Sequence, residues 1–484
     1  MKLPSSVSRV TDWLTEKSAS EYSRLASYRA EASRKAEKST SILRKHWIVK
    51  RYWPLFLPGL IWLSLFIFFQ NFQPWANARH CQFLGQLDAA KEGIKPYNIM
   101  LVADPQLIDN NTYPNYGKFA LWLSTFTVDN YIYKNYWQLV DTLKPDAVVF
   151  LGDLLDNGRE SSDVYYEYEF RRFNRTFQPE LLRKRGIEVV LNIPGNHDIG
   201  FGNGVTKPSL DRFEKHFGKT NQVISRAGHQ FVMLDAISLS NTRYEAVSAE
   251  SKVFLRQLHD DVSHPPRILF NHVPLYRDPK EATCGPFRES EKCLPAVAGY
   301  QYQTLINPTI SNVILRYAQP SIIFSGDDHD YCEMVHTYEY NGEQKHAIEI
   351  NVKSISMAMG IWKPAVQLLT VFDKPLKGKV VRVNGEEVKD IEPTFMYSMC
   401  MLTPPYEDII FYSIFAAVNF LFFVYICCKP EKWRSSMAID DVYEEPKLWN
   451  RIKAINIKML FELCLVGFVV VWFVYYTLFT VHYY

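Results

Sequence analysis

Three long apolar segments constrain the fold of this chain most strongly. Tyr52–Gln70 and Ile409–Cys428 carry no charged residue, and Leu460–Leu478 carries only Glu462. About 20 apolar residues suffice for a helix to cross the hydrocarbon core of a bilayer. The first segment could instead be an uncleaved signal, but about fifty residues precede it and no small-residue cleavage site follows it. The sequence therefore predicts three transmembrane helices, with Glu462 near an interface or inside a helix contact, because a carboxylate is costly in lipid.

Basic residues predict the orientation of these helices. "LRKHWIVKR" precedes the first segment, and "KPEKWR" and "KLWNRIKAINIK" lie between the last two. Lys and Arg collect on the cytoplasmic side of membranes. The first 51 residues also hold 12 Lys/Arg against 5 Asp/Glu, which suits a tail near an anionic leaflet. The predicted order is a basic cytoplasmic tail (1–51), a span (52–70), a lumenal domain (71–408), a span (409–428), a cytoplasmic loop (429–459), a span (460–478) and a lumenal tail (479–484).

The cysteines and the charge agree with a lumenal domain. Five of the eight cysteines fall in the lumenal block: Cys81, Cys284, Cys293, Cys332 and Cys400. Cys284 and Cys293 are close enough in sequence to close a loop, and an odd number leaves at least one free or paired with another chain. Asn110 and Asn174 begin possible glycosylation triplets. The formal net charge of +2 argues against a dedicated nucleic-acid binder.

A pattern of short apolar runs predicts an α/β domain. Each run is rich in β-branched or aromatic residues and ends in a polar loop. Continuous apolar runs indicate strands that are covered on both faces, with helices outside. Helical patterns such as "YKNYWQLVDTLK" fill some gaps. The runs are "YNIMLVAD", "DAVVFLGD", "EVVLNIPGNHD", "QFVMLD", "RILFNHVP" and "SIIFSGDDH".

The residues at the ends of these runs point to a metal site. Ligands bind beyond the carboxyl ends of strands in α/β sheets. One aspartate after a strand is usually a turn or a helix cap, and one histidine is usually structural. Oxygen and imidazole donors from five strands together are what two divalent cations, about 3.5–4 Å apart, require. These donors are Asp104, Gln106, Asp153, Asn196, His272, Asp327 and His329, with His197 beside them.

Five ordered motifs carry a family resemblance. "DPQ", "GDLLDNGR", "GNHD", "NHVP" and "GDDH" resemble the signatures of the calcineurin-like metallophosphoesterase superfamily across about residues 97–355. The resemblance implies a four-layer fold of two mixed sheets flanked by helices. It implies that Asp153 bridges two metals, that Asp104, Gln106 and His329 complete one site, and that Asn196, His272 and Asp327 complete the other. His197 is implied to contact the scissile phosphate and to protonate the leaving oxygen.

Two departures from the superfamily pattern predict the metal. Gln106 and Asp327 stand where the superfamily has histidines. Both changes replace nitrogen by oxygen, which favours Mn²⁺ or Mg²⁺ over zinc. Arg159 and Arg277 are candidate phosphate contacts, although a surface ion pair is an equal alternative for each. Asp328 is a candidate to attract a substrate ammonium group.

The full set of motifs, together with "VKSISMAMG" and the three spans, resembles the phosphoesterases that remodel GPI glycans, in the form of their fungal cell-division-cycle branch. This resemblance implies a manganese-dependent phosphodiesterase of the endoplasmic reticulum or Golgi membrane. Its substrate would be a GPI-anchored protein or GPI glycolipid, from which it removes ethanolamine phosphate on the first mannose. Two alternatives stay open: a lumenal phosphatase acting on protein or lipid phosphoesters, and an inactive metal-binding scaffold. The oligomeric state is not predicted.

Overall fold

A computed structural model describes residues 51–279, 283–299, 301–428 and 455–480. These residues form two compact units. The larger unit spans Phe66–Ile410 and continues from Tyr476, and the smaller unit holds the described residues before Phe66 and between Phe411 and Tyr475. Most of the predicted cytoplasmic tail and of the loop between the last two spans lies outside the described residues.

Two mixed β-sheets form the centre of the larger unit, and all six predicted apolar runs contain strands. One sheet has the order β15-β12-β1-β2-β3, and the other has the order β10-β11-β9-β6-β5-β4. The first comprises β1 (Tyr97–Val102), β2 (Ala147–Phe150), β3 (Glu188–Val190), β12 (Ala365–Val371) and β15 (Phe395–Met401). The second comprises β4 (Gln222–Arg226), β5 (His229–Met233), β6 (Arg267–Phe270), β9 (Pro320–Ser325), β10 (Cys332–Tyr340) and β11 (Glu343–Asn351).

Alternate residues of each strand feed two different cores. Ile99 and Leu101 of β1 join a cluster that also contains Phe270 and Phe324, and so fill the space between the sheets. Met100 and Val102 instead join the cluster that contains the apolar helix residues. This alternation follows from the two-residue period of a strand. Burial on both faces explains why the runs are continuously apolar.

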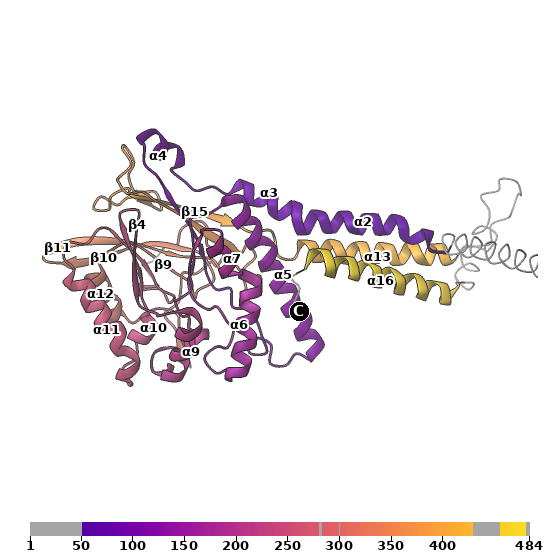
Figure 1. The fold of residues 1–484 in the computed structure, drawn as a ribbon, viewed down its shortest axis with the longest axis horizontal. Helices are drawn as coiled ribbons and strands as arrows, with labels where there is room; N and C mark the ends of the chain where they lie inside the picture. Colours follow the sequence, from indigo (N-terminus) through magenta and orange to yellow (C-terminus); the bar gives the residue numbers. More distant parts are fainter. Residues whose placement is uncertain (1–50, 280–282, 300, 429–454, 481–484) are drawn as a thin grey trace, which may run out of the picture. The chain divides into compact units, whose positions relative to one another are not determined.

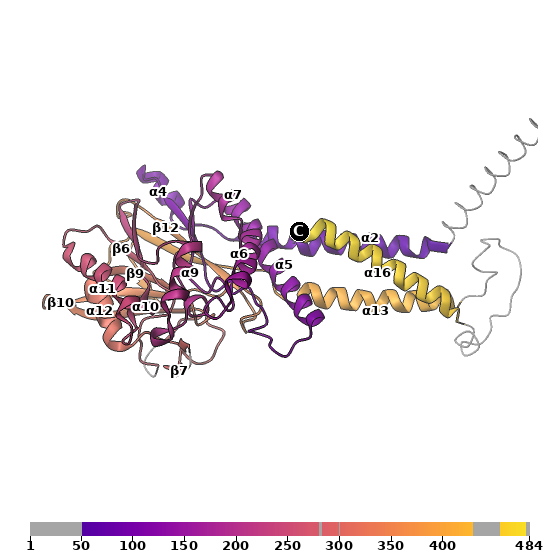
Figure 2. The same cartoon turned by 60° about the horizontal axis from the view of Figure 1, so that its bottom comes forward.

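Helices cover the outer faces of both sheets. One group lies on one side of the sheets: α5 (Lys118–Leu143), α6 (Asp163–Phe177) and α7 (Pro179–Lys184). Another lies on the other side: α10 (Ala236–Leu239), α11 (Glu245–Asp260) and α12 (Pro308–Ala318) (Figures 1 and 2). The predicted four-layer metallophosphoesterase fold is confirmed.

The domain core extends past the motifs. Strand β12 pairs with β1 in the middle of the first sheet, and β15 pairs with β12. Both strands lie beyond residue 355, where the prediction placed the end of the core. Their residues carry no metal-site motif, so the sequence pattern gave no reason to include them.

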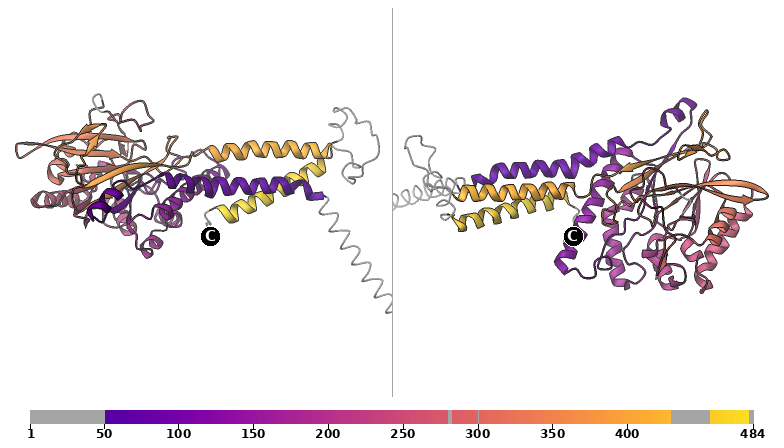
Figure 3. Two further views of the ribbon diagram at one scale, coloured as in Figure 1. Left: turned by 90° about the horizontal axis from the view of Figure 1, so that it is seen from above. Right: turned by 180° about the vertical axis from the view of Figure 1, so that it is seen from behind.

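Three helices are long and apolar enough to cross a membrane: Trp53–His80, Glu407–Cys427 and Ile457–Phe479. They match the predicted segments, although the first continues ten residues beyond the predicted end at Gln70. Within the smaller unit, α2 (Phe56–Ile67), α13 (Glu407–Cys427) and α16 (Ile457–Phe479) lie side by side (Figures 1 and 3).

Contacts inside this bundle include an aromatic pair and an ion pair that engages Glu462. Trp62 of α2 packs edge-on against Phe415 of α13, with the ring centroids 5.1 Å apart. The carboxylate of Glu462 accepts a hydrogen bond of 2.9 Å from Arg51 Nε. A charge in a bilayer is tolerated when it is paired. The predicted helix contact of Glu462 is therefore confirmed.

The five cysteines of the predicted lumenal block fall into two groups. Cys81 and Cys400 form a disulfide that joins the start of the unit to β15. The sulfur of Cys284 lies within bonding reach of both Cys293 and Cys332. One sulfur can take part in only one disulfide, so an odd cysteine remains, as the sequence predicts.

Candidate metal centre

The predicted ligands meet where the strands of both sheets end. β1 leads to Asp104 and Gln106, β2 to Asp153, and β9 to Asp327 and His329. All five of these residues have positive φ angles, between 31° and 67°. Non-glycine residues rarely adopt this left-handed conformation, and they do so mainly where surrounding structure enforces it. Five such residues at one edge indicate a backbone shaped to aim side chains at a common point.

His272, which follows β6, lies at the centre of the cluster. Its Nδ1 donates a hydrogen bond of 2.7 Å to the carbonyl oxygen of Leu151. This bond leaves Nε2 as the ligand nitrogen. Nε2 lies 3.3 Å from Asn196 Oδ1, 3.4 Å from Asp153 Oδ1 and 3.6 Å from Asp327 Oδ1. Ligand atoms of Asp104, Asp153 and His272 all lie within 4.8 Å of one another, close enough to hold a metal ion.

Two buried oxygens test whether the cluster fits a metal. Asp104 Oδ2 and Gln106 Oε1 have no hydrogen-bond partner among the described residues. Buried polar atoms normally have a hydrogen-bond partner. Two buried oxygens without one are therefore available to coordinate a cation. The Gln106 amide is oriented by its Nε2, which donates to Asp156 Oδ1 at 3.2 Å. The donor set is dominated by oxygen and therefore fits hard divalent cations.

The electrostatics of the cluster also favour cations. Burial raises the pKa of Asp104 well above its usual value, and the charges of Asp153 and Asp327 add to this effect. Burial alone would lower the pKa of His272, but Asp153, Asp327 and Asp104 raise it well above its usual value. The cluster thus concentrates negative charge that a bound dication neutralises.

His329 is placed as a neutral ligand. Burial lowers its pKa, although Asp327 and Asp153 act in the opposite direction. A histidine must be unprotonated to bind a metal. The charges that act on its pKa are those of the predicted ligands Asp327, Asp153 and His272 and of His197.

His197 lies beside the metal cluster and is held from three directions. Its backbone N–H donates to Asp153 Oδ1 at 2.9 Å. Its Nδ1 donates to the carbonyl oxygen of Asp156 at 2.5 Å, and Gln106 Nε2 lies 3.2 Å from both ring nitrogens. The side chain is 22% exposed. Nε2 is therefore the nitrogen left to exchange a proton with a substrate.

Close approach explains two glycines. A side chain at Gly195 would collide with the carboxylate of Asp153, and one at Gly152 would meet His272 Nδ1 at 2.5 Å. Gly152 also has a φ of 92°, which favours glycine. Both glycines therefore leave the space that the ligands occupy.

The three predicted substrate contacts have different partners in the structure. Arg159 lies at the site: its N–H donates to His197 O and its Nη1 donates to Asn196 O, each at 3.1 Å. The buried guanidinium of Arg277 pairs with Glu349 at 2.9 Å. Asp328 is paired with Arg288. Of these three, Arg159 is the one that contacts the predicted ligand Asn196 and the predicted acid His197.

The segment around Arg288 explains the remaining aspartates of "SGDDHDYC". Arg288 pairs with Asp328, and the N–H groups of Glu289 and Ser290 donate to Asp330 Oδ2 at 2.9 and 2.8 Å. Lys353 lies 3.2 Å from Asp330 Oδ1. Asp328 and Asp330 therefore fasten this segment over the loop, while Asp327 remains in the metal cluster.

Two residues that hydrogen-bond to the predicted ligands, Asp156 and Ser354, were not predicted from the sequence. Asp156 accepts hydrogen bonds from Gln106 and from the N–H groups of Asp109 (3.0 Å) and Thr112 (2.9 Å). Ser354 donates from Oγ to Asp104 O at 2.8 Å. Asp156 stands three residues after Asp153 in the same motif, and that spacing was the available signal. Ser354 lies in "VKSISMAMG", where nothing in the sequence singles it out.

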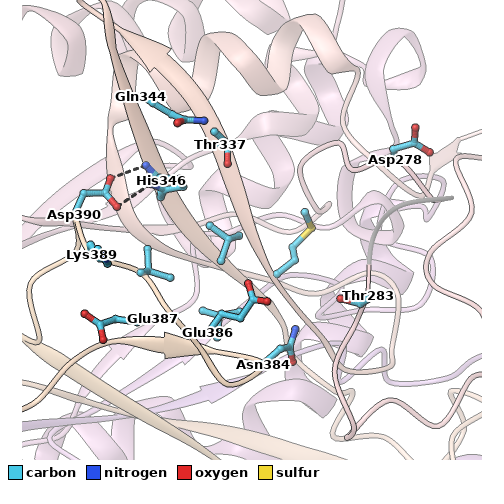
Figure 4. A pocket seen from close by; sticks show the side chains of 14 residues that line it. Asp278, Thr283, Thr337, Gln344, His346, Asn384, Glu386, Glu387, Lys389 and Asp390 are labelled. Carbon is cyan, nitrogen blue, oxygen red and sulfur yellow. Dashed lines mark hydrogen bonds and ion pairs between the residues drawn. The ribbon is translucent and has the colours of Figure 1, made fainter.

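A separate cavity of about 860 Å³ lies beside β10 and β11, next to the hairpin of β13 (Arg382–Val383) and β14 (Glu386–Glu387). Its lining includes Glu386, Glu387 and the His346–Asp390 pair (Figure 4). None of the predicted metal ligands lines it. The metal cluster and this cavity are different places on the molecule.

Comparisons with known proteins agree with the geometry. Residues 97–331 match the family described as Calcineurin-like phosphoesterase. The chain is 38% identical over 397 residues to Cell division control protein 1 of Saccharomyces cerevisiae, covering 82% of this chain and 78% of that one. It is also 30% identical over 216 residues to Metallophosphoesterase 1 of Rattus norvegicus (40% and 52% covered) and 28% identical over 239 residues to Metallophosphoesterase 1 of Gallus gallus (45% and 58% covered). The chain spans little more than half of these two animal relatives.

Proposed function

Because this chain belongs to the calcineurin-like metallophosphoesterase family and is a metal-dependent phosphoesterase, we propose that it hydrolyses a phosphodiester of a membrane glycolipid. The proposed substrate is a GPI glycolipid or GPI-anchored protein, from which the enzyme removes an ethanolamine-phosphate branch on the first mannose. The main support for this proposal is that the same chain contains both the metal cluster and three helices able to span a membrane.

The extent of similarity supports this membrane setting. The family match covers residues 97–331, whereas the alignment with the yeast protein covers 397 residues. The likeness therefore extends well beyond the phosphoesterase motifs. A substrate fixed in the same membrane as the enzyme is met at high local concentration, so tight binding from solution is not needed.

The proposed roles follow the geometry. Two divalent cations would be held by the seven predicted ligands Asp104, Gln106, Asp153, Asn196, His272, Asp327 and His329. When bound, these cations would supply Lewis-acid chemistry to the phosphate and to water. Arg159 orients the phosphate through its guanidinium. His197 Nε2 donates a proton to the leaving mannose oxygen, while the Asp156 carbonyl oxygen holds Nδ1. Since Gln106 and Asp327 contribute oxygen where histidine would contribute nitrogen, the proposed metal is manganese.

We place the enzyme in the membrane of the endoplasmic reticulum or Golgi, with its catalytic unit in the lumen. The Cys81–Cys400 disulfide supports an oxidising compartment. Asn110, in an exposed turn, is the better placed of the two possible glycosylation sites, because Asn174 lies within α6. Basic residues around the apolar helices support a cytoplasmic N-terminus.

Mass analysis of GPI glycans after depletion of the protein tests the proposal. The expected result is an additional phosphoethanolamine on the first mannose, removed by wild type but not by Asp153→Ala. Purified protein with Mn²⁺ should release ethanolamine phosphate from a GPI glycan faster than phosphate from phosphoserine or a lysophospholipid. Unchanged glycans together with turnover of either other substrate would establish a different phosphatase. No turnover of any substrate, with metal bound, would establish an inactive scaffold.

A further inference from the structure

The first turns of α5 expose an unusual apolar face. Phe119 is 73% exposed, Trp122 43% and Leu123 42%, and Tyr116 just before the helix is 48% exposed. Positions 119, 122, 123 and 126 follow the spacing of a single helix face. Contiguous exposed apolar surface on a folded protein commonly marks an interaction site.

Contacts within the larger unit connect α5 to the ends of all three apolar helices. Lys134 Nζ donates to the carbonyl oxygen of Phe69, two residues past the end of α2, at 3.4 Å. The same ammonium pairs at 2.8 Å with Asp408, at the start of the second helix. The ring of Phe126 stacks on Tyr476, near the end of the third helix, with centroids 6.3 Å apart. Within the larger unit, α5 therefore contacts Phe69, Asp408 and Tyr476, which belong to three different apolar helices.

The exposed face continues directly from these contacts. Phe119, Trp122 and Phe126 form a row of rings, with Phe119–Trp122 centroids 5.9 Å apart and Trp122–Phe126 centroids 5.5 Å apart. Tyr476 extends the row. At 1.5 Å per residue, Leu123 lies only about 5 Å along the axis from Phe126. The row therefore runs from the end of an apolar helix onto the surface of α5.

We propose that the first two turns of α5 lie in the headgroup region of the membrane, with Phe119, Trp122 and Leu123 buried among the lipids. Tryptophan and tyrosine are enriched at this depth because their rings are partly apolar and partly polar. Helices of this kind bind in the plane of the interface with the apolar face inward. Lys118, exposed at the start of α5, can reach the lipid phosphates.

This contact would bring the metal centre to the membrane surface, an inference that rests on the proposed function. The chain leaving Gln106 is tied to Asp156 through Asp109 and Thr112. Only six residues separate Thr112 from Phe119, and these seven steps of extended chain reach at most about 25 Å. A phosphodiester in the headgroup layer, rather than one in free solution, is then the substrate that the site meets.

Depth-dependent fluorescence quenching tests the membrane contact without relying on activity. The full chain, with Cys427, Cys428 and Cys464 replaced by alanine, is placed in phosphatidylcholine nanodiscs. A cysteine replaces Leu123 or, as a control, Val262, which is 80% exposed beyond α11. Each is labelled with an NBD fluorophore, and protein without an added cysteine corrects for labelling elsewhere.

The label at 123 should be quenched by lipid carrying a shallow doxyl group and protected from iodide, and the label at 262 should show the reverse. Equal iodide quenching at both positions would overturn the proposal. Protection at 123 without quenching by doxyl lipid would also overturn it, because a protein surface would then cover α5.

A kinetic comparison provides the second test. Phe119→Ser/Leu123→Ser should lower turnover of a phosphodiester lipid in vesicles by about tenfold through lost presentation. Turnover of water-soluble bis(p-nitrophenyl) phosphate should be unchanged. The matched control Val164→Ser/Val262→Ser, which also removes two exposed apolar side chains, should lower neither rate. Equal vesicle rates for the two double variants would refute the inference, whereas failure of wild type on both substrates would refute the proposed function alone.

Discussion

Replacement of Arg277 by methionine separates a structural role from a substrate contact. The side chains of Arg277 and Glu349 are fully buried and pair at 2.9 Å. Glu349 also accepts hydrogen bonds from Ser325 Oγ at 2.8 Å and His336 Nε2 at 2.5 Å. Methionine has similar length, so it fills most of the space but leaves the carboxylate without its main partner. Removing one member of a buried ion pair costs about 3–5 kcal/mol.

That cost converts into a measurable change of melting temperature. The unfolding entropy of the unit that contains Phe66–Ile410 is about 0.7 kcal/mol per kelvin, so the expected decrease in Tm is about 4–7 °C. The matched control is Arg159→Met, which removes a half-buried guanidinium without leaving a carboxylate unpaired. It should keep its Tm and raise KM. Melting is followed in detergent by intrinsic fluorescence with saturating Mn²⁺.

The pH dependence of this difference has a definite sign. Burial alone would raise the pKa of Glu349, but Arg277 and then His336 hold it below its usual value. Such a carboxyl stabilises the fold above its unfolded pKa, and this stabilisation is lost as the pH falls through the folded pKa. In the variant, burial without the guanidinium favours the protonated form. The Tm difference should therefore shrink as the pH is lowered toward the usual pKa of a glutamate, about 4.3.

One result would refute the reasoning. If Arg277→Met melts like wild type and instead raises KM as Arg159→Met does, the guanidinium meets substrate and does not serve the core.

Three further predictions concern the metal centre. Gly195→Ala should lose bound metal and activity because its methyl group collides with Asp153, and metal analysis showing full occupancy would contradict this. Asp327→His should raise the ratio of zinc-supported to manganese-supported turnover, since it restores a nitrogen ligand, and an unchanged ratio would show that the substitution is neutral. Asp156→Asn should lower kcat by about a hundredfold and shift its pH profile with little change in KM, because it neutralises the carboxylate that lies 3.6 Å from His197 Nδ1 and holds the Gln106 amide; an effect on KM alone would show that Asp156 acts in substrate binding.

Local sequence patterns determined the frame of the molecule. A continuous apolar run between polar loops has few folded solutions other than a strand covered on both faces, and all six runs contain strands. Polar groups at the ends of such strands must meet at one edge, so the ligands Asp104, Asp153 and His272 could be predicted from position alone. Apolar length likewise predicted the three long helices.

Only the tertiary structure decided which similar residues do different work. Three aspartates of one loop, Asp327, Asp328 and Asp330, have identical side chains but different partners. Asp327 joins the metal cluster. Asp328 pairs with Arg288, and Asp330 pairs with Lys353. Arg159 and Arg277 both follow metal motifs in the sequence. Only the folded structure places Glu349 where it pairs with Arg277 in the protein interior. The physical reason is that the partner of a charged side chain is often far away in the sequence. A carboxylate that folding brings close to a guanidinium determines whether that guanidinium remains available to a substrate.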